Sequence, residues 1–108
     1  MTIDEIKNGL INSCLNGNAK SFIPFLLAEK VETGMPNKTR FYRFFKHMLN
    51  CSKGNSIGEW DLQIENADWM NEKNSLAYNF FDKVHKYARL TLIIRENNDR
   101  IYIETMPF

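Results

Sequence analysis

The clearest pattern in the chain is an alternation of apolar and polar residues near its C-terminus. Leu90, Leu92 and Ile94 alternate with mostly polar residues, and Ile101 and Ile103 do the same after an Asn-rich turn. Two alternating runs on either side of such a turn predict a β-hairpin. Because a lone hairpin is barely stable in water, the rest of the chain must supply more strands and a cover for the apolar face.

The register of this hairpin depends on the length of its turn. A two-residue loop of Asn97 and Asn98 sets Ile94 opposite Ile101, whereas a four-residue loop that ends at Arg100 shifts the pairing and keeps the same faces. A slip by one residue would mix the apolar and polar faces. Asn tolerates the positive φ of a type I′ turn, so we prefer the two-residue loop.

Two segments of the first half of the chain have the period of α-helices. Thr2 and Glu5 form a capping-box pattern ahead of residues 3–15, where apolar side chains recur at helical spacing. The other segment is residues 38–49, where one apolar stripe at the i, i+3, i+4 and i+7 positions predicts the third helix of the chain. Residues 50–55 then predict a polar loop.

Between these two lies a short, very apolar helix. Ser21 is preferred to Asn18 as its cap, because this choice puts Pro24 in the first turn, where a proline loses no intrahelical hydrogen bond. The helix should end near Lys30. A short extended piece over residues 31–35 is expected to follow.

The pattern of the second half of the chain predicts β-strands. Residues 60–65 alternate, and the apolar phase slips afterwards, which predicts a β-bulge near Asn66. Residues 75–84 fit a strand with one aromatic face and also fit a helix. We prefer the strand, because it would form a meander with its neighbours on both sides.

These elements predict an α+β fold, with three N-terminal helices packed on a curved antiparallel sheet of three to five strands that ends in a β-hairpin. A chain of 108 residues has the size of one domain, residues 1–108. Three segments are similar to those of a known family: the helix–Gly–helix start at residues 15–18, the helix over 38–49 and the hairpin over 94–102. The order of these segments resembles the nuclear-transport-factor-two-like superfamily, which includes ketosteroid-isomerase-like and polyketide-cyclase-like proteins.

That resemblance implies a pocket between the helices and the curved sheet, which some members use for isomerase or cyclase chemistry. Such chemistry needs a general base beside a donor for the developing oxyanion. The bases available are Asp68, His85 and Glu104, and the donors are Tyr42, Tyr78 and Tyr102. None of them forms a recognisable pair in the sequence, so we predict no catalytic residue, no cofactor and no enzyme activity.

Composition narrows the alternatives. A formal net charge of +1 gives no global attraction to nucleic acid or to an acidic membrane. The sequence has no run of about eighteen apolar residues, so we predict no membrane span. The acidic N-terminus does not resemble a secretory signal. Cys14 and Cys51 are too far apart for a zinc motif, and we expect both to be small core residues in a reducing cytoplasm. Asp61 and Glu65 have no His or Cys nearby, so we predict no metal site.

Three further groups of residues could form binding surfaces. The helix over 38–49 interleaves basic and aromatic residues, which fits either a solvated amphipathic helix or a basic surface for phosphates or an acidic partner. Trp60 and Trp69 fit either a core or an interface. An acidic row formed by Asp61, Gln63, Glu65 and Asp68 fits either a solvated sheet face or a complement to a basic protein.

The sequence therefore favours a non-catalytic protein-binding domain, in its sharpest form a bacterial immunity or antitoxin protein that covers a cognate toxin. The alternative is a small-molecule pocket protein or an isomerase-like or cyclase-like enzyme, with an apolar cavity lined by Phe41, Tyr78, Phe80, Leu92 and Trp69. A homodimer through the open sheet face is compatible with either. The predicted partner-binding residues are Asp61, Gln63, Glu65, Asp68, Trp69, Arg89, Arg95, Tyr102 and Glu104.

Overall fold

A computed structural model describes residues 1–34, 37–54, 60–67, 74–83 and 88–107. Over these residues it confirms the α+β class, with three α-helices, a short 3₁₀ helix and one mixed sheet. The elements in chain order are α1 (Ile3–Leu15), η1 (Lys20–Phe22), α2 (Ile23–Leu26), β1 (Val31–Thr33), α3 (Lys38–Gly54), β2 (Trp60–Asn66), β3 (Ser75–Asp82), β4 (Ala88–Asn97) and β5 (Arg100–Pro107).

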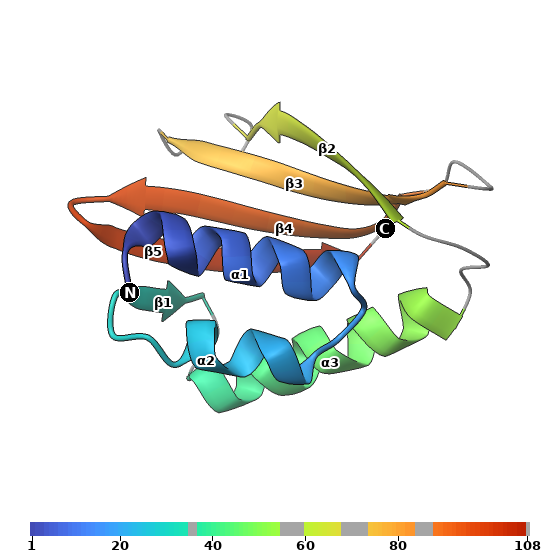
Figure 1. Cartoon of the computed structure of the whole chain (residues 1–108), viewed down its shortest axis with the longest axis horizontal. Helices are drawn as coiled ribbons and strands as arrows, with labels where there is room; N and C mark the ends of the chain where they lie inside the picture. The colour runs from blue at the N-terminus through green and yellow to red at the C-terminus, as the bar shows by residue number, and fades with distance from the viewer. Residues whose placement is uncertain (35–36, 55–59, 68–73, 84–87, 108) are drawn as a thin grey trace.

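The strands lie in the order β1-β5-β4-β3-β2, and the helices lie on one side of them (Figure 1). Neighbouring strands from β2 to β5 are antiparallel, but β1 runs parallel to β5 with Val31 opposite Ile101. The prediction of a purely antiparallel sheet is therefore wrong at this edge. The reason is that β1 pairs with the last strand of the chain, where the Ile101 N–H donates to the Lys30 carbonyl at 2.8 Å.

The terminal hairpin turns one residue later than preferred. Asn98 and Asp99 form its turn, with φ of 50° and 62°, the left-handed values of a type I′ turn. The preferred loop of Asn97 and Asn98 is thus wrong, and the register is that of the four-residue alternative. In this register Arg95 faces Tyr102 instead of another arginine, so a like-charge pair is avoided.

The bounds of two helices also differ from the prediction. The second helix, α2, spans Ile23–Leu26 without a side-chain cap, so it neither begins at a Ser21 cap nor continues to Lys30. Ahead of the 3₁₀ helix η1, Asn18 Oδ1 accepts the backbone N–H groups of Lys20 and Ser21 at 3.1 and 3.3 Å. The helix α3 continues to Gly54 instead of ending at Leu49. No residue before that glycine breaks a helix, so the polar residues predicted as a loop extend α3.

The strand preferred for residues 75–84 is confirmed over Ser75–Asp82 as β3, and Val84 lies outside the described residues, but the predicted bulge is misplaced. The pairing of β2 with β3 is unbroken through Asn66. The irregularity lies between Phe80 and Phe81, where β3 pairs with β4. The phase slip after residue 65 therefore marks the end of the strand and not a bulge.

One apolar core joins the helices to one face of the sheet. Phe22 and Phe45 stack inside it, with ring centroids 4.1 Å apart. Trp60 belongs to this core with 8% of its surface exposed, so the core interpretation of that residue is confirmed. The hairpin residues predicted to be covered are all buried here: Leu90, Leu92, Ile94, Ile101 and Ile103.

Only one of the two cysteines lies in the core. Cys14 is buried, and burial raises the pKa of its thiol, so the reactive thiolate is rare there. Cys51 is exposed on α3, with its Sγ 3.7 Å from Nε2 of His47, and the prediction of a core position is wrong for it. We expect Ellman's reagent to modify Cys51 in the native protein and Cys14 only after denaturation. Equal rates for both thiols in the native state would contradict this.

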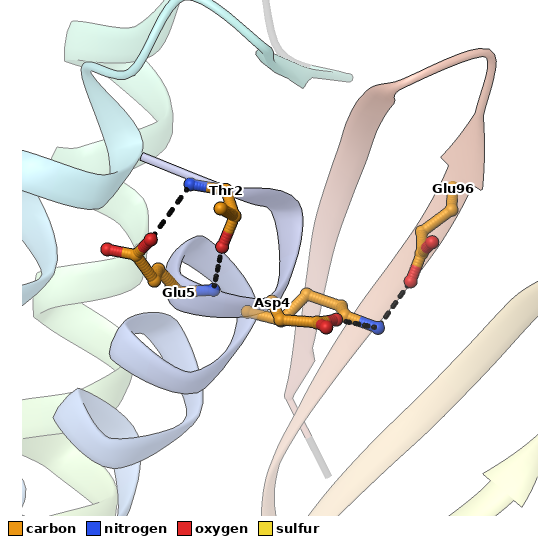
Figure 2. A network of polar contacts seen from close by, with 5 residues as sticks. Thr2, Asp4, Glu5 and Glu96 are labelled. Atoms are coloured by element: carbon orange, nitrogen blue, oxygen red, sulfur yellow. Dashed lines mark hydrogen bonds and ion pairs between the residues drawn. The ribbon is translucent and has the colours of Figure 1, made fainter.

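The start of α1 is tied to the hairpin by charge (Figure 2). Thr2 and Glu5 form the predicted capping box, with the Glu5 N–H donating to Thr2 Oγ1 at 3.1 Å and the Thr2 N–H donating to Glu5 Oε1 at 3.3 Å. The ammonium group between Asp4 and Glu96 belongs to Lys7, which pairs with both carboxylates. Because Glu96 lies on β4, this pair fixes the first helix against the sheet.

Removing the Lys7 ammonium group should lower the free energy of unfolding at neutral pH and have less effect at strongly alkaline pH. The hydrogen bond to Glu96 raises the pKa of Lys7 from 10.5, so its contribution is present below that value and is lost as pH rises through the folded pKa. We expect Lys7→Met to lower the free energy of unfolding by about 0.5 kcal/mol at pH 7, and by less above pH 10.5, in urea titrations. Lys20→Met, at an exposed lysine, is the control. A loss that is the same at both pH values would argue against the ion pair.

Candidate protein-binding face

The sheet face away from the helices gathers many of the residues predicted to bind a partner. The strand register sets Glu65, Ala77, Ile93 and Glu104 in one row across four strands, so adjacent side chains in the row are neighbours. We call the predicted residues on this side the outer face: Asp61, Gln63 and Glu65 on β2, Arg95 on β4, and Tyr102 and Glu104 on β5. Asp68 and Trp69 lie outside the described residues, and so does the side chain of Arg89, whose backbone is in β4.

The centre of this side of the sheet is buried. Ala67, Ala77 and Ile93 form a small apolar cluster there, and none of them is more than 4% exposed. Ile93, the apolar exception in an otherwise polar alternation, is thereby explained. Exposure is greatest along β2, where Asp61, Gln63 and Glu65 are all exposed.

A chain of side-chain hydrogen bonds crosses the buried centre. The Asn79 carboxamide donates to Glu65 Oε1 at 3.1 Å, and the Thr91 hydroxyl donates to Asn79 Oδ1 at 2.6 Å. These bonds satisfy a buried amide and hold the Glu65 carboxylate against the sheet. Neither Asn79 nor Thr91 is among the residues predicted to bind a partner, because alternation assigns residues to a face without saying how deeply they are buried.

The opposite end of the outer face holds a linked cation, phenol and carboxylate. The guanidinium of Arg95 lies 4.3 Å from the ring centroid of Tyr102, and the Tyr102 hydroxyl donates to Glu104 Oε1 at 3.1 Å. Gly34 allows this arrangement, because a Cβ atom there would come within 2.4 Å of the Tyr102 hydroxyl. The structure thus brings together Glu104 and Tyr102, a base and a donor that were not recognised as a pair in the sequence, and their i, i+2 spacing on one strand face was the available signal.

The other candidates for catalysis are not brought together. Asp68 and His85 lie outside the described residues. Tyr78 is buried on the helix-facing side of β3, where burial raises the pKa of its hydroxyl, and Tyr42 is half-buried on α3. Among the residues with described positions, no three or more His, Cys, Asp or Glu side chains cluster as a metal site would require.

The residues predicted to line an apolar cavity belong to the core. Phe41, Tyr78, Phe80 and Leu92 are each at most 6% exposed, and Trp69 lies outside the described residues. A hollow of about 200 Å³ lies beside Glu104, and its volume is below the range of roughly 300–1,000 Å³ that is typical of ligand pockets. It is lined by Gly34, Phe41, Glu104 and Thr105. A larger and more polar hollow, of about 830 Å³, lies beside the hairpin turn.

The basic side chains described on α3 form no part of the outer face. Arg40, Arg43 and Lys46 are exposed on the helix, whereas the Lys38 ammonium donates to the Ala28 carbonyl at 2.9 Å. Within the residues that the structure places, no helix combines the length and the apolar character needed to cross a membrane.

No protein-family model, curated protein or solved structure matches this chain. The resemblance to the nuclear-transport-factor-two-like superfamily therefore stays a prediction from the order of the elements. Function has to be argued from the chemistry of the outer face itself.

Proposed function

We propose that this domain is a non-catalytic binding protein that recognises a protein partner through the outer face. In its sharpest form the partner is a basic toxin, and the domain is a bacterial immunity or antitoxin protein that blocks the toxin by covering its surface. The observation that supports this most is the row of exposed Asp61, Gln63 and Glu65 on the same face as Arg95 and Tyr102. Arginine and tyrosine are over-represented among the residues that dominate protein interfaces.

The charges of β2 favour a basic partner. None of the ion pairs within the described chain includes Asp61 or Glu65. Among the residues with described positions, Asp61 accepts the N–H of Leu62, at 3.0 Å, and Glu65 accepts the Asn79 amide. Exposed carboxylates attract a cationic partner and accelerate its association.

The proposal is tested by co-expressing the protein with the product of the neighbouring gene in the native genome. We expect rescue of growth, and a complex whose affinity falls about tenfold or more when Asp61→Lys and Glu65→Lys are combined. Tyr102→Ala should weaken the complex without changing its dependence on salt. Glu29→Lys, at an exposed carboxylate between α2 and β1, is the matched charge control.

Two results would contradict this function. One is a complex that is unaffected by both the charge reversals and Tyr102→Ala. The other is a protein that captures no macromolecule and binds a small molecule tightly instead. A homodimer through the outer face is a further arrangement, and sedimentation of the wild type against Tyr102→Ala distinguishes it from a heteromeric complex.

A pocket protein of the nuclear-transport-factor-two-like superfamily, with a curved sheet and a cytoplasmic location, is the second candidate function. The Tyr102–Glu104 hydrogen bond beside the hollow that Phe41 lines favours it, because a phenol and a carboxylate could bind a polar group there. Thermal unfolding with a library of small carbonyl compounds tests this. A ligand at 100 times its Kd should stabilise the protein by about 2.7 kcal/mol, and Glu104→Gln should reduce that effect.

A further inference from the structure

The strand β2 forms one edge of the sheet (Figure 1). In the described part of the chain, no strand pairs with the edge of β2 that points away from β3. The Ala67 N–H donates to the Ser75 carbonyl at 3.0 Å. Hydrogen-bonded and non-hydrogen-bonded pairs alternate in antiparallel sheets, so Leu62, Ile64 and Asn66 direct their backbone groups away from β3. The Leu62 N–H is taken by the Asp61 side chain, which leaves the N–H groups of Ile64 and Asn66 at the edge.

The two sides of this edge have opposite chemistry. On the helix-facing side, Ile64 is 56% exposed, and Leu76, its diagonal neighbour on β3, is 39% exposed. These large apolar side chains extend the core beyond the cover of the helices. On the other side, Asp61 and Glu65 are exposed carboxylates. An exposed edge of this kind is a template for another strand.

In the register with the fullest overlap, antiparallel pairing of β2 with a second copy of itself is electrostatically unfavourable. The antiparallel register with the fullest overlap is centred on Gln63, and it would set Asp61 of each copy opposite Glu65 of the other. Like charges directly opposite each other destabilise strand pairs. The edge is therefore complementary to a different chain, one that carries cations where β2 carries carboxylates.

We propose that an extended segment of a basic protein partner adds to the sheet along β2. Its apolar side chains cover Leu62 and Ile64, and its basic side chains lie against Asp61 and Glu65. Residues opposite each other in a sheet share a face, so the segment has the pattern basic–apolar–polar–apolar–basic over five residues. The pattern is symmetric, so it holds for either strand direction. This inference rests on the proposed protein-binding function and specifies which part of the partner docks, and where.

A short peptide tests the docking directly. The probe is Thr-Lys-Ile-Thr-Val-Lys-Thr, acetylated and amidated, and the control peptide has the same composition in an order without alternation. We expect the probe to bind at least about tenfold more tightly than the control by calorimetry. Hydrogen exchange should slow at the amides of Ile64 and Asn66, because these N–H groups gain an acceptor.

Variants separate backbone pairing from charge. Ile64→Pro removes an N–H that points away from β3, so it blocks an added strand without removing a bond to β3. It should weaken the probe about tenfold, whereas Ile64→Val, which keeps the amide, should not. The combined Asp61→Lys and Glu65→Lys reversal should weaken the probe to a similar extent, and it tests the site even if the proline disturbs folding.

Three results would overturn the docking site. They are probe binding that is unchanged in both Ile64→Pro and the charge reversal, slowed exchange at amides other than those of β2, and a wild-type dimer that Ile64→Pro dissociates. A cellular partner that is lost by Tyr102→Ala but kept by Ile64→Pro would refute the docking site and leave the proposed function standing. A probe that binds at β2 while neither co-expression nor affinity capture finds a partner would count against the proposed function instead.

Discussion

Replacing Phe45 by alanine is expected to destabilise the protein by about 3–5 kcal/mol. Phe45 has no exposed surface, and its ring stacks on Phe22 with centroids 4.1 Å apart and planes inclined by 23°. The ring of Phe41 lies 6.4 Å away and almost parallel. Truncation removes the closer of the two ring contacts that join α3 to Phe22 of η1, and it leaves a cavity beside the rings of Phe22 and Phe41. A domain of this size has only about 5–15 kcal/mol of stability, so the loss would be a large fraction of the total.

Phe44 provides the matched control, because it is the adjacent residue of α3 and is only partly buried. We expect Phe44→Ala to cost about 1 kcal/mol, mainly from the apolar surface that it stops burying. Urea unfolding followed by circular dichroism compares the two variants with the wild type. Similar losses at the two positions would show that the Phe22–Phe45 stack does not anchor α3.

Gly9→Ala is expected to destabilise the protein, although alanine is the better helix former by about 1 kcal/mol. A Cβ atom at Gly9 would lie 2.2 Å from Cζ of Phe25, far inside contact distance. The glycine thus lets the Phe25 ring lie directly on the backbone of α1. Forcing the ring away costs about 1–3 kcal/mol, which outweighs the gain in helix propensity.

A double-mutant cycle isolates this contact. Phe25→Ala removes the ring, so in that background we expect Gly9→Ala to stabilise the protein by up to about 1 kcal/mol through helix propensity alone. The change of sign between the two backgrounds, measured by urea unfolding, is the prediction. An equal effect of Gly9→Ala in both backgrounds would show that the ring does not limit the space at this glycine.

The periodic patterns of the sequence determined which face of the first helix and of the terminal strands turns to the core. The helix predicted over residues 3–15 has those bounds in the structure, and its capping box forms as expected. The apolar residues of the hairpin all enter the core even though the turn lies one residue later than preferred. A shift of pairing by an even number of residues preserves both faces, so alternation predicts the face of a strand without its exact register.

The tertiary structure alone decided which elements are neighbours. Periodicity says nothing about partners far along the chain, so it did not indicate that β1 lies parallel to β5, that Cys51 is exposed at the end of a longer helix, or that Asn79 links Glu65 to Thr91. The candidate binding face likewise depends on which strands are neighbours. The sequence determined that Asp61, Glu65 and Tyr102 lie on polar strand faces, and only the order of the strands placed them on the same side of one sheet, because that order depends on long-range packing and not on local pattern.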